Sequence, residues 1–310
     1  MLRRMYRTLH KAVPAIRRLG PGVEAMGPDV PFRLSPKDGR RVVFGGVALR
    51  VFGDPGDAYY AEVARHLQAQ DRLCSVLRAR CAPREGGPVV LDVGANIGVA
   101  TMAMATALHG PARFLAVEPS PRNLAHLRHN LAANGFEPRV EVIAAAAGAE
   151  PGSLSFHESE FGAGSHLVSG HHLAGDAMPA VQVPEETLDR IVSARGLERL
   201  DLVKIDVEGF EPDVLAGGAG AIERFRPAIY MEFNSWTLMA YRDMNPRGFL
   251  EDLVRRFPHV LAFGAKGELE PVNGQHGMLG FLHRNLVERG CVDDIVLCFD
   301  TDWTRGLAVA

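Results

Sequence analysis

The sequence predicts an α/β fold with a mostly parallel sheet and helices on both faces. Three observations carry this prediction. Residues 89–93 form an apolar run interrupted only by Asp92, which is typical of a strand buried in a parallel sheet. Gly94 and Gly98 follow and permit a tight turn and close approach of a ligand to the backbone. Residues 99–108 have almost no polar side chains and predict the next helix, completing the nucleotide-binding element of doubly wound folds.

Further strands and helices are expected in the alternating order of such a sheet. Pro121 favours the first turn of a helix over residues 121–134, and Asn134–Gly135 predicts its end. The closing strands are expected to form an antiparallel hairpin. Strands are predicted at residues 114–117, 140–144, 201–207, 227–233, 260–263, 278–283 and 295–299, with added strands at 153–157 and 181–183.

The chain is expected to divide into an accessory region, residues 1–84, and a nucleotide-binding domain, residues 85–310. Within the accessory region, residues 32–44 and 47–52 alternate in polarity and predict a hairpin. Its turn is expected at Lys37–Asp38–Gly39. Residues 57–80 predict one amphipathic helix, with Tyr60, Val63, Ala64, Leu67, Val76 and Leu77 facing inward.

The first twenty residues form a basic arm that contains arginines and a lysine but no acid. Apolar residues recur in it at helical spacing. One hypothesis is that this arm is a basic amphipathic helix that makes peripheral contact with a membrane surface or an acidic partner. An organellar presequence and an ordinary surface helix are the alternatives.

The composition excludes several other classes of protein. A net charge of −3 gives no reason to expect nucleic acid as the main partner. The four cysteines show no C-x-x-C pairing, so we expect reduced thiols in a cytoplasmic protein. No run approaches the ~18 apolar residues of a membrane span, and no transmembrane segment is expected.

Two acids near the glycine loop indicate the cofactor. A carboxylate at Asp92, on a buried strand, is costly unless a ligand amine or the loop N–H groups pair with it. Glu118 lies about 20 residues beyond the loop, at the end of the next strand, where it is placed to accept hydrogen bonds from ribose hydroxyls. The loop reads Gly-x-Asn-x-Gly, which favours an adenosine ligand with an amino-acid tail over a pyrophosphate. S-adenosylmethionine is such a ligand. The alternative is an ordinary βαβ unit with a chance acid.

The predicted fourth and fifth strands carry the chemistry. Lys204 and Asp206 share a face of one strand and need one another or a ligand. Glu232 lies on the neighbouring strand, so Asp206 and Glu232 are expected at the carboxyl edge of the sheet, where ligands bind. The alternative is a structural ion-pair network around Lys204.

Several ordered motifs resemble the FkbM family of methyltransferases. They lie at residues 92–98, 117–119, 187–189 and, above all, 203–211. The resemblance implies a class I methyltransferase fold with a seven-stranded sheet, S-adenosylmethionine as methyl donor, and O-methylation of sugars or natural products. The chain departs from the family at Val99–Ala100, and the alanine run 144–147 leaves the adenine contact unspecified.

Together these observations predict an S-adenosylmethionine-dependent O-methyltransferase that acts on a small-molecule or glycan acceptor. The expected catalytic residues are Asp206, Glu232, Lys204 and Glu208, with Asp206 or Glu232 as the base. The expected cofactor-binding residues are Asp92, Gly94, Ala95, Asn96, Gly98, Glu118 and Pro119.

Three alternatives remain open. In one, Asp206, Glu208 and Glu232 hold Mg²⁺ by hard oxygen ligands. In another, the protein binds the cofactor without turnover. The third concerns the insert 158–179. Its residues His166, His171 and His172 suggest a metal site but lack convincing ligand geometry. The other hypothesis for this insert is a lid that covers the substrate.

Overall fold

The computed structural model describes residues 39–81, 87–157, 166–167, 180–265 and 267–307. The chain divides into two units, Met1–Phe32 and Arg33–Ala310, and all described residues lie in the second. The described part of the accessory segment therefore belongs to the same unit as the sheet, and this division places no boundary at residue 84. The basic arm lies outside the described residues. Within them, no helix is long and apolar enough to cross a lipid bilayer.

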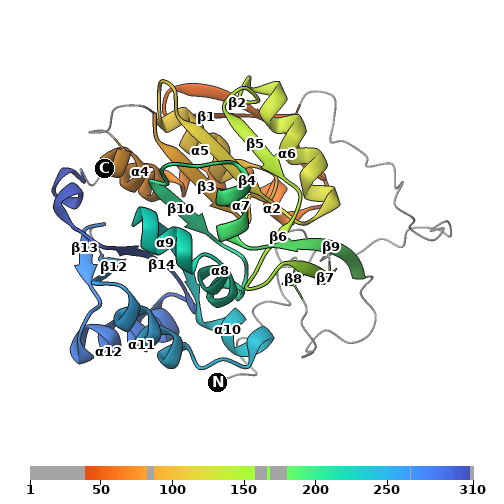
Figure 1. Ribbon diagram of the computed structural model, residues 1–310. Helices are drawn as coiled ribbons and strands as arrows, with labels where there is room; N and C mark the ends of the chain where they lie inside the picture. Colours follow the sequence, from red (N-terminus) through yellow and green to blue (C-terminus); the bar gives the residue numbers. More distant parts are fainter. Residues whose placement is uncertain (1–38, 82–86, 158–165, 168–179, 266, 308–310) are drawn as a thin grey trace, which may run out of the picture. The chain divides into compact units, whose positions relative to one another are not determined.

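The core of this unit is a mostly parallel sheet with the strand order β13-β12-β14-β11-β10-β3-β4-β5 (Figure 1). The pairs from β5 to β11 are parallel, whereas β14 runs antiparallel to both of its neighbours. The α/β prediction is confirmed, and the short β13 is an addition to the seven strands expected. The strands are β3 (Val89–Val93), β4 (Arg113–Val117), β5 (Val140–Ile143), β10 (Leu202–Ile205), β11 (Ala228–Asn234), β12 (His259–Phe263), β13 (Leu269–Pro271) and β14 (Val292–Cys298).

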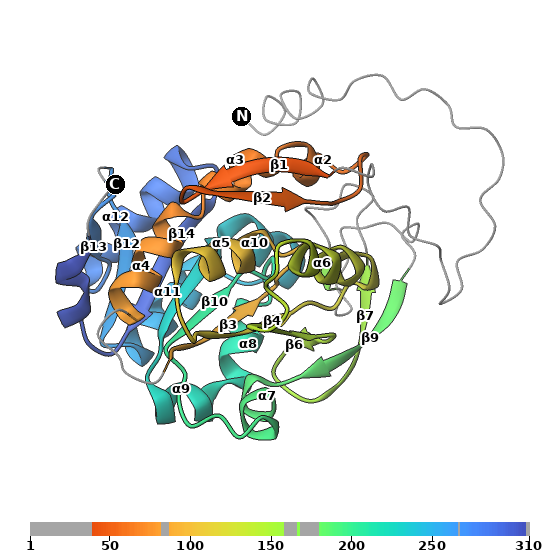
Figure 2. The same ribbon diagram turned by 90° about the horizontal axis from the view of Figure 1, so that it is seen from above.

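Helices cover both faces of the sheet, whose central strands β3, β4 and β10 are almost wholly buried (Figure 2). Along β3, Val90 packs into one core, whereas Leu91 and Val93 pack into the other. The first core includes α4 (Asp71–Cys81), α5 (Val99–Ala107) and α6 (Pro121–Ala133). The second includes α7 (Leu188–Ala194), α8 (Glu211–Gly217), α9 (Ala219–Phe225), α10 (Ser235–Arg242), α11 (Pro246–Arg256) and α12 (Gln275–His283).

Three predictions about individual elements were wrong. Residues 278–283 are not a strand but the second half of α12, in which Met278, Phe281 and Leu282 face the core. Their spacing of three and four residues fits a helix, and a run this short does not discriminate the two structures. A π-helical turn, Arg284–Glu288, follows.

The accessory segment also differs from its prediction. Its hairpin consists of β1 (Arg40–Phe44) and β2 (Val47–Val51). The turn is Gly45–Gly46, where both φ angles are positive, rather than Lys37–Gly39, most of which lies outside the described residues. The predicted single helix is three helices, α2 (Ala58–Ala61), α3 (Val63–Gln68) and α4.

A smaller sheet has the order β6-β9-β7-β8. Its strands are β6 (Ala146–Ala147), β7 (Gly152–His157), β8 (His166–Leu167) and β9 (Ala180–Glu186), so the added strands are confirmed. Of the three histidines in the insert, His166 lies in β8, while His171 and His172 lie outside the described residues.

A buried amide joins the accessory segment to the glycine loop. Asn130 on α6 has no exposed surface. Its Oδ1 accepts a hydrogen bond from the Phe52 N–H (2.6 Å), and its Nδ2 donates to the carbonyls of Phe52 (2.9 Å) and Ile97 (2.7 Å). Because buried amides need such partners, this group fixes three segments relative to one another.

Candidate active site

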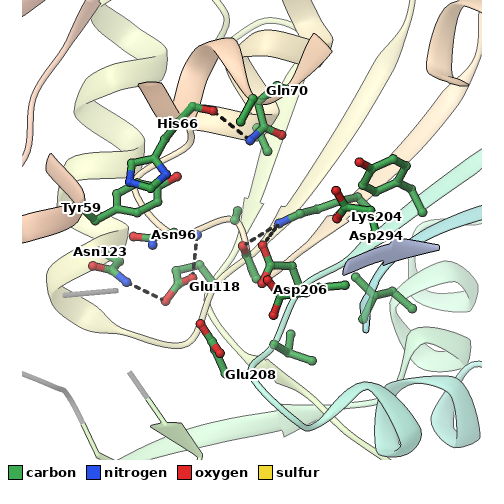
Figure 3. A pocket seen from close by; sticks show the side chains of 18 of the residues that line it. Tyr59, His66, Gln70, Asn96, Glu118, Asn123, Lys204, Asp206, Glu208 and Asp294 are labelled. Atoms are coloured by element: carbon green, nitrogen blue, oxygen red, sulfur yellow. Dashed lines mark hydrogen bonds and ion pairs between the residues drawn. The ribbon is translucent and has the colours of Figure 1, made fainter. Parts of the chain in front are cut away.

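A pocket of about 360 Å³ opens at the carboxyl ends of β3, β4, β10 and β11 (Figure 3). This is the edge where ligands bind in open α/β sheets. Of the residues predicted for the site, Gly94, Ala95, Asn96, Glu118 and Pro119 line the pocket from one side. The predicted catalytic residues Lys204, Asp206, Glu208 and Glu232 line it from the other.

The glycine loop is held against the ends of two strands. The N–H groups of Gly94 and Ala95 both donate to the Val117 carbonyl at 3.0 Å. Gly94 has φ +80°, and a Cβ there would collide with the carbonyl oxygen of Asp206. Glycine at this position therefore allows the loop to pack on the end of β10, rather than only clearing a path for a ligand. The consequence is that Asp206 lies directly beside the loop.

Glu118 is a buried carboxylate that faces the pocket. One oxygen accepts from the Asn96 N–H (2.8 Å), and the other accepts from the Ser120 N–H (2.9 Å) and the Asn123 Nδ2 (3.3 Å). Burial raises the pKa of Glu118 to about 7, although these three hydrogen bonds lower it. A carboxylate accepts about four hydrogen bonds, so capacity for a ligand hydroxyl remains.

The residues around Glu118 fit the adenosine part of S-adenosylmethionine. Ala95 and Ala100 line the pocket and present no side chain beyond Cβ, which leaves room beside the backbone. Asn96 and Asn123 add amide donors and acceptors next to the acid. An acid flanked by amides, beside small residues, is a donor set suited to a ribose diol.

Asp92 lies behind the loop and outside the pocket lining. Its side chain has no exposed surface. One oxygen accepts from the Thr101 hydroxyl (2.5 Å), and the other lies 3.4 Å from the Lys204 ammonium. The protein itself therefore supplies a hydroxyl donor and a counter-charge to this buried carboxylate, although the oxygen facing Lys204 makes no hydrogen bond within the described residues. Gly98 is also away from the lining; it caps α5 with φ +92° and packs against Leu127.

Lys204 is a buried ammonium at the centre of the site. Its Nζ lies 3.1 Å from Asp206 and 3.4 Å from Asp92, and it donates to the Gly94 carbonyl at 3.3 Å. Burial alone would lower the pKa of Lys204, but the charges of Asp206 and Asp92 outweigh it and raise that pKa. Lys204 is thus a fixed positive charge that joins the loop to Asp206.

Three carboxyl groups meet on the opposite side of the pocket. Oxygens of Asp206, Glu208 and Glu232 lie within 4.8 Å of one another; among the described residues, this is the group close enough to hold a metal ion. Burial, and then the charge of Asp206, raises the pKa of Glu208 to about 8 and that of Glu232 well above its ordinary value. Glu208 is therefore mostly protonated at neutral pH, and the same causes favour the protonated form of Glu232.

The sequence reasoning missed two groups of lining residues. Asp294 on β14 lies opposite Glu232 in the antiparallel register, and burial raises the pKa of Asp294 to about 6. It precedes a predicted strand, but only the pairing of that strand brings it to the site. Tyr59, His66 and Gln70 come from the accessory segment. Their spacing of seven and four residues, on one helical face, was the available signal.

A sequence profile described as the methyltransferase FkbM domain matches residues 92–257, more than half of the 310 residues. The chain belongs to the FkbM methyltransferase family. This membership confirms the prediction of an S-adenosylmethionine-dependent methyltransferase. The matched span contains the glycine loop, Glu118 and the three clustered carboxyl groups, but neither Tyr59 nor Asp294.

Two curated relatives have similar sequences. The 2-O-methyltransferase NoeI of Sinorhizobium fredii is 30% identical over 196 residues, which cover 59% of this FkbM-family chain and 78% of NoeI. The 31-O-demethyl-FK506 methyltransferase FkbM of Streptomyces tacrolimicus is 31% identical over 179 residues, covering 48% of this chain and 68% of that protein. Among solved structures, an O-methyltransferase from Bacillus cereus in complex with SAH aligns with a TM-score of 0.40 and 17% identity, covering 78% of this chain and 92% of that one.

Proposed function

We propose that this chain transfers a methyl group from S-adenosylmethionine to a hydroxyl oxygen of a sugar, glycan or other small-molecule acceptor. One observation carries the proposal. A single pocket joins the glycine loop and Glu118, which suit the cofactor, to the Asp206–Lys204 ion pair, which suits proton removal. The printed names of the two curated relatives, 2-O- and 31-O-, also place the transferred methyl group on oxygen in those proteins.

In this proposal the glycine loop, Glu118 and Pro119 hold the cofactor, which supplies a methyl group activated by its sulfonium. Glu118 accepts hydrogen bonds from the ribose, and the backbone of Gly94, Ala95 and Asn96 borders the rest of the ligand. Asp92 lies behind the glycine loop and does not contact the cofactor. It holds Lys204 in place, since its two oxygens face Thr101 and Lys204.

Asp206 is the proposed base, because its side chain is 40% exposed and ion-paired with Lys204. An acceptor hydroxyl beside it loses its proton to the carboxylate as the oxygen reacts. Glu208 and Glu232 suit a different role. Since burial and the neighbouring Asp206 raise their pKa, they present hydroxyl donors that orient the acceptor rather than bases that deprotonate it.

The acceptor half of the pocket also indicates which partners the chain avoids. Its charged and carboxyl side chains include Asp206, Glu208, Glu232 and Asp294, while Lys204 is already paired with two carboxylates. Because this lysine is already paired, the described lining of the acceptor half offers no free ammonium to a phosphate-rich acceptor, which supports the proposal that nucleic acid is not the substrate.

The test is a transfer assay with the purified full chain. Labelled S-adenosylmethionine is incubated with methyl glucopyranoside, methyl mannopyranoside, cyclohexane-1,2-diol and a cell-derived glycan fraction. Mass spectrometry then locates the methyl group. We expect O-methylated product from at least one acceptor. Tight binding of S-adenosylhomocysteine without transfer to any acceptor would instead support the non-catalytic alternative.

The magnesium alternative has one observation in its favour, the closeness of Asp206, Glu208 and Glu232. We propose transfer without a metal, because Lys204 already provides a cation 3.1 Å from Asp206. Turnover is therefore expected to persist after dialysis against EDTA. Loss of turnover that Mg²⁺ alone restores would establish the alternative.

The cellular setting is the remaining part of the proposal. We infer a cytoplasmic protein, supported by the free thiols of Cys74, Cys81, Cys291 and Cys298. Peripheral contact through the basic arm stays a prediction from the sequence.

A further inference from the structure

One wall of the pocket comes from outside the matched domain, which begins at residue 92. Tyr59 on α2 and His66 on α3 line the pocket from the accessory segment. Their rings stack with centroids 4.1 Å apart and an interplanar angle of 17° (Figure 3). We call these two residues the aromatic wall.

The aromatic wall is fixed relative to the glycine loop. The Asp57 carboxylate caps α2 by accepting from the Tyr59 N–H at 2.7 Å, which sets the start of the helix. Just before it, Asp54 forms an ion pair with Arg122 on α6 at 2.6 Å. Asn130 holds Phe52 and the glycine loop together through the same helix. Tyr59 therefore has a defined place in the site.

The two rings have different electrostatic surroundings. Burial raises the pKa of Tyr59, and the nearby charges that act on its hydroxyl are those of Lys204 and Asp206, followed by Asp92. The charges that act on His66 are those of Arg65 and Glu62, whose side chains are mostly exposed. Both rings are half-buried, and of the two it is the Tyr59 hydroxyl that is exposed to the charges of Lys204 and the proposed base Asp206, with the His66 ring stacked beside it.

The Tyr59 hydroxyl has no hydrogen-bond partner among the described residues. Its neighbour Tyr60 shows the ordinary arrangement, because its hydroxyl donates to the Val51 carbonyl at 3.3 Å. The Tyr59 side chain is half-buried, so its hydroxyl faces the pocket rather than a protein acceptor. Since Tyr59 lines the pocket, this hydroxyl is available to a molecule bound there.

We propose that Tyr59 is a further catalytic residue, whose hydroxyl donates a hydrogen bond to the acceptor oxygen while Asp206 receives the proton of that oxygen. His66 is then a positioning residue that holds the ring of Tyr59. This inference rests on the proposed O-methylation. The acceptor O–H bond breaks and its proton goes to Asp206. The oxygen forms the bond to the methyl carbon, the S–C bond breaks with its electron pair left on sulfur, and Tyr59 keeps its own proton.

The test compares Tyr59→Phe with Tyr60→Phe, which removes the same hydroxyl one residue away and outside the pocket. In Tyr59→Phe the ring and its stacking remain. We expect kcat to fall about 10- to 100-fold, the usual range for one lost hydrogen bond to a developing charge. Calorimetry should show an S-adenosylhomocysteine Kd within about 2-fold of wild type. Tyr60→Phe should retain wild-type kcat.

His66 is tested by His66→Ala and His66→Phe, with kcat, KM and Tm measured for both. We expect His66→Ala to lower kcat at similar Tm, and His66→Phe to restore kcat, because a phenyl ring keeps the stack.

Each outcome decides between the two proposals. Full kcat in Tyr59→Phe overturns the inference while leaving O-methylation intact. The inference is also overturned if Tyr59→Phe weakens S-adenosylhomocysteine binding by the same factor as it lowers kcat, because Tyr59 then contacts the cofactor. If the wild-type chain methylates no hydroxyl, the proposed function fails and the inference with it.

Discussion

The two halves of the pocket treat their carboxyl groups in opposite ways. In the cofactor half, Glu118 accepts three hydrogen bonds from the protein, two of them from backbone N–H groups. In the acceptor half, Glu208 and Glu232 lie within 4.8 Å of each other and of Asp206. Glu232 receives one side-chain hydrogen bond, from Asn234 at 3.2 Å.

This difference separates binding from chemistry. A carboxylate surrounded by fixed donors is ready to receive the same ligand group in every cycle. Carboxyl groups that face one another cannot all be ionised, so their environments divide them into an ion-paired base and protonated donors. The cofactor half is therefore preorganised for binding, whereas the acceptor half is arranged for proton transfer.

The largest expected effect is that of Asp206→Asn, which keeps the shape of the side chain but removes its basicity. Turnover should fall by about 10²–10⁴-fold, the usual cost of losing a general base. The Kd for S-adenosylhomocysteine, measured by calorimetry, should stay close to wild type. Lost cofactor binding would move Asp206 into the cofactor half and break the comparison.

Lys204→Met should harm stability as well as turnover, because it leaves Asp92 buried beside no cation. Breaking a buried ion pair costs about 3–5 kcal/mol. Thermal melting should therefore show a clearly lower Tm, which Asp206→Asn should not. An unchanged Tm would contradict the structural role of Lys204 between the two halves.

Glu118→Ala should weaken cofactor binding by about 1–3 kcal/mol through lost hydrogen bonds to a carboxylate. Calorimetry with S-adenosylhomocysteine measures the change. The matched control is Glu137→Ala, since Glu137 is an exposed residue on the surface. If both variants bind alike, the ribose assignment is lost.

The smallest expected effect is on the pH dependence of stability. The pKa of Glu208 is raised from 4.5 to about 8, mainly by burial. The native state therefore holds a proton that the unfolded state releases, and the free energy of unfolding falls as pH rises through this window. In Glu208→Gln this decline is reduced, so its Tm relative to wild type should increase from about pH 5 to about pH 8 and then level off. A constant difference across that range would show that the native state does not raise the pKa of Glu208.

The sequence predicted the cofactor half better than the acceptor half, for a physical reason. A buried strand, a glycine turn and an acid are consecutive features of one βαβ unit, so local spacing reveals them. Asp206 and Glu232 were also predicted at one edge, because parallel neighbours end at the same edge. Asp294 was not, since only the antiparallel pairing of β14 with β11 brings it opposite Glu232.

The accessory segment shows the same limit. Its hairpin and helices were expected, but periodicity alone assigned Tyr60 inward and passed over Tyr59. Which face of α2 points toward the pocket depends on local contacts that periodicity does not reveal. These include the hydrogen bond from the Tyr59 N–H to Asp57 and the end of α2 at Glu62. Gly94 was expected to allow close approach of a ligand. That a Cβ at this position would collide with the carbonyl of Asp206 could not be predicted, because it depends on how the loop packs on the end of β10.

The amide of Asn130 has a consequence for how the molecule opens. Its three hydrogen bonds connect Phe52, which directly follows β2, to α6 and the glycine loop, and the amide that makes them has no exposed surface. Peeling the hairpin away would strand a desolvated amide group, so the hairpin cannot fray independently of the helix. The backbone amide of Phe52 should therefore exchange its hydrogen for deuterium together with the amides of α6, as one cooperative unit.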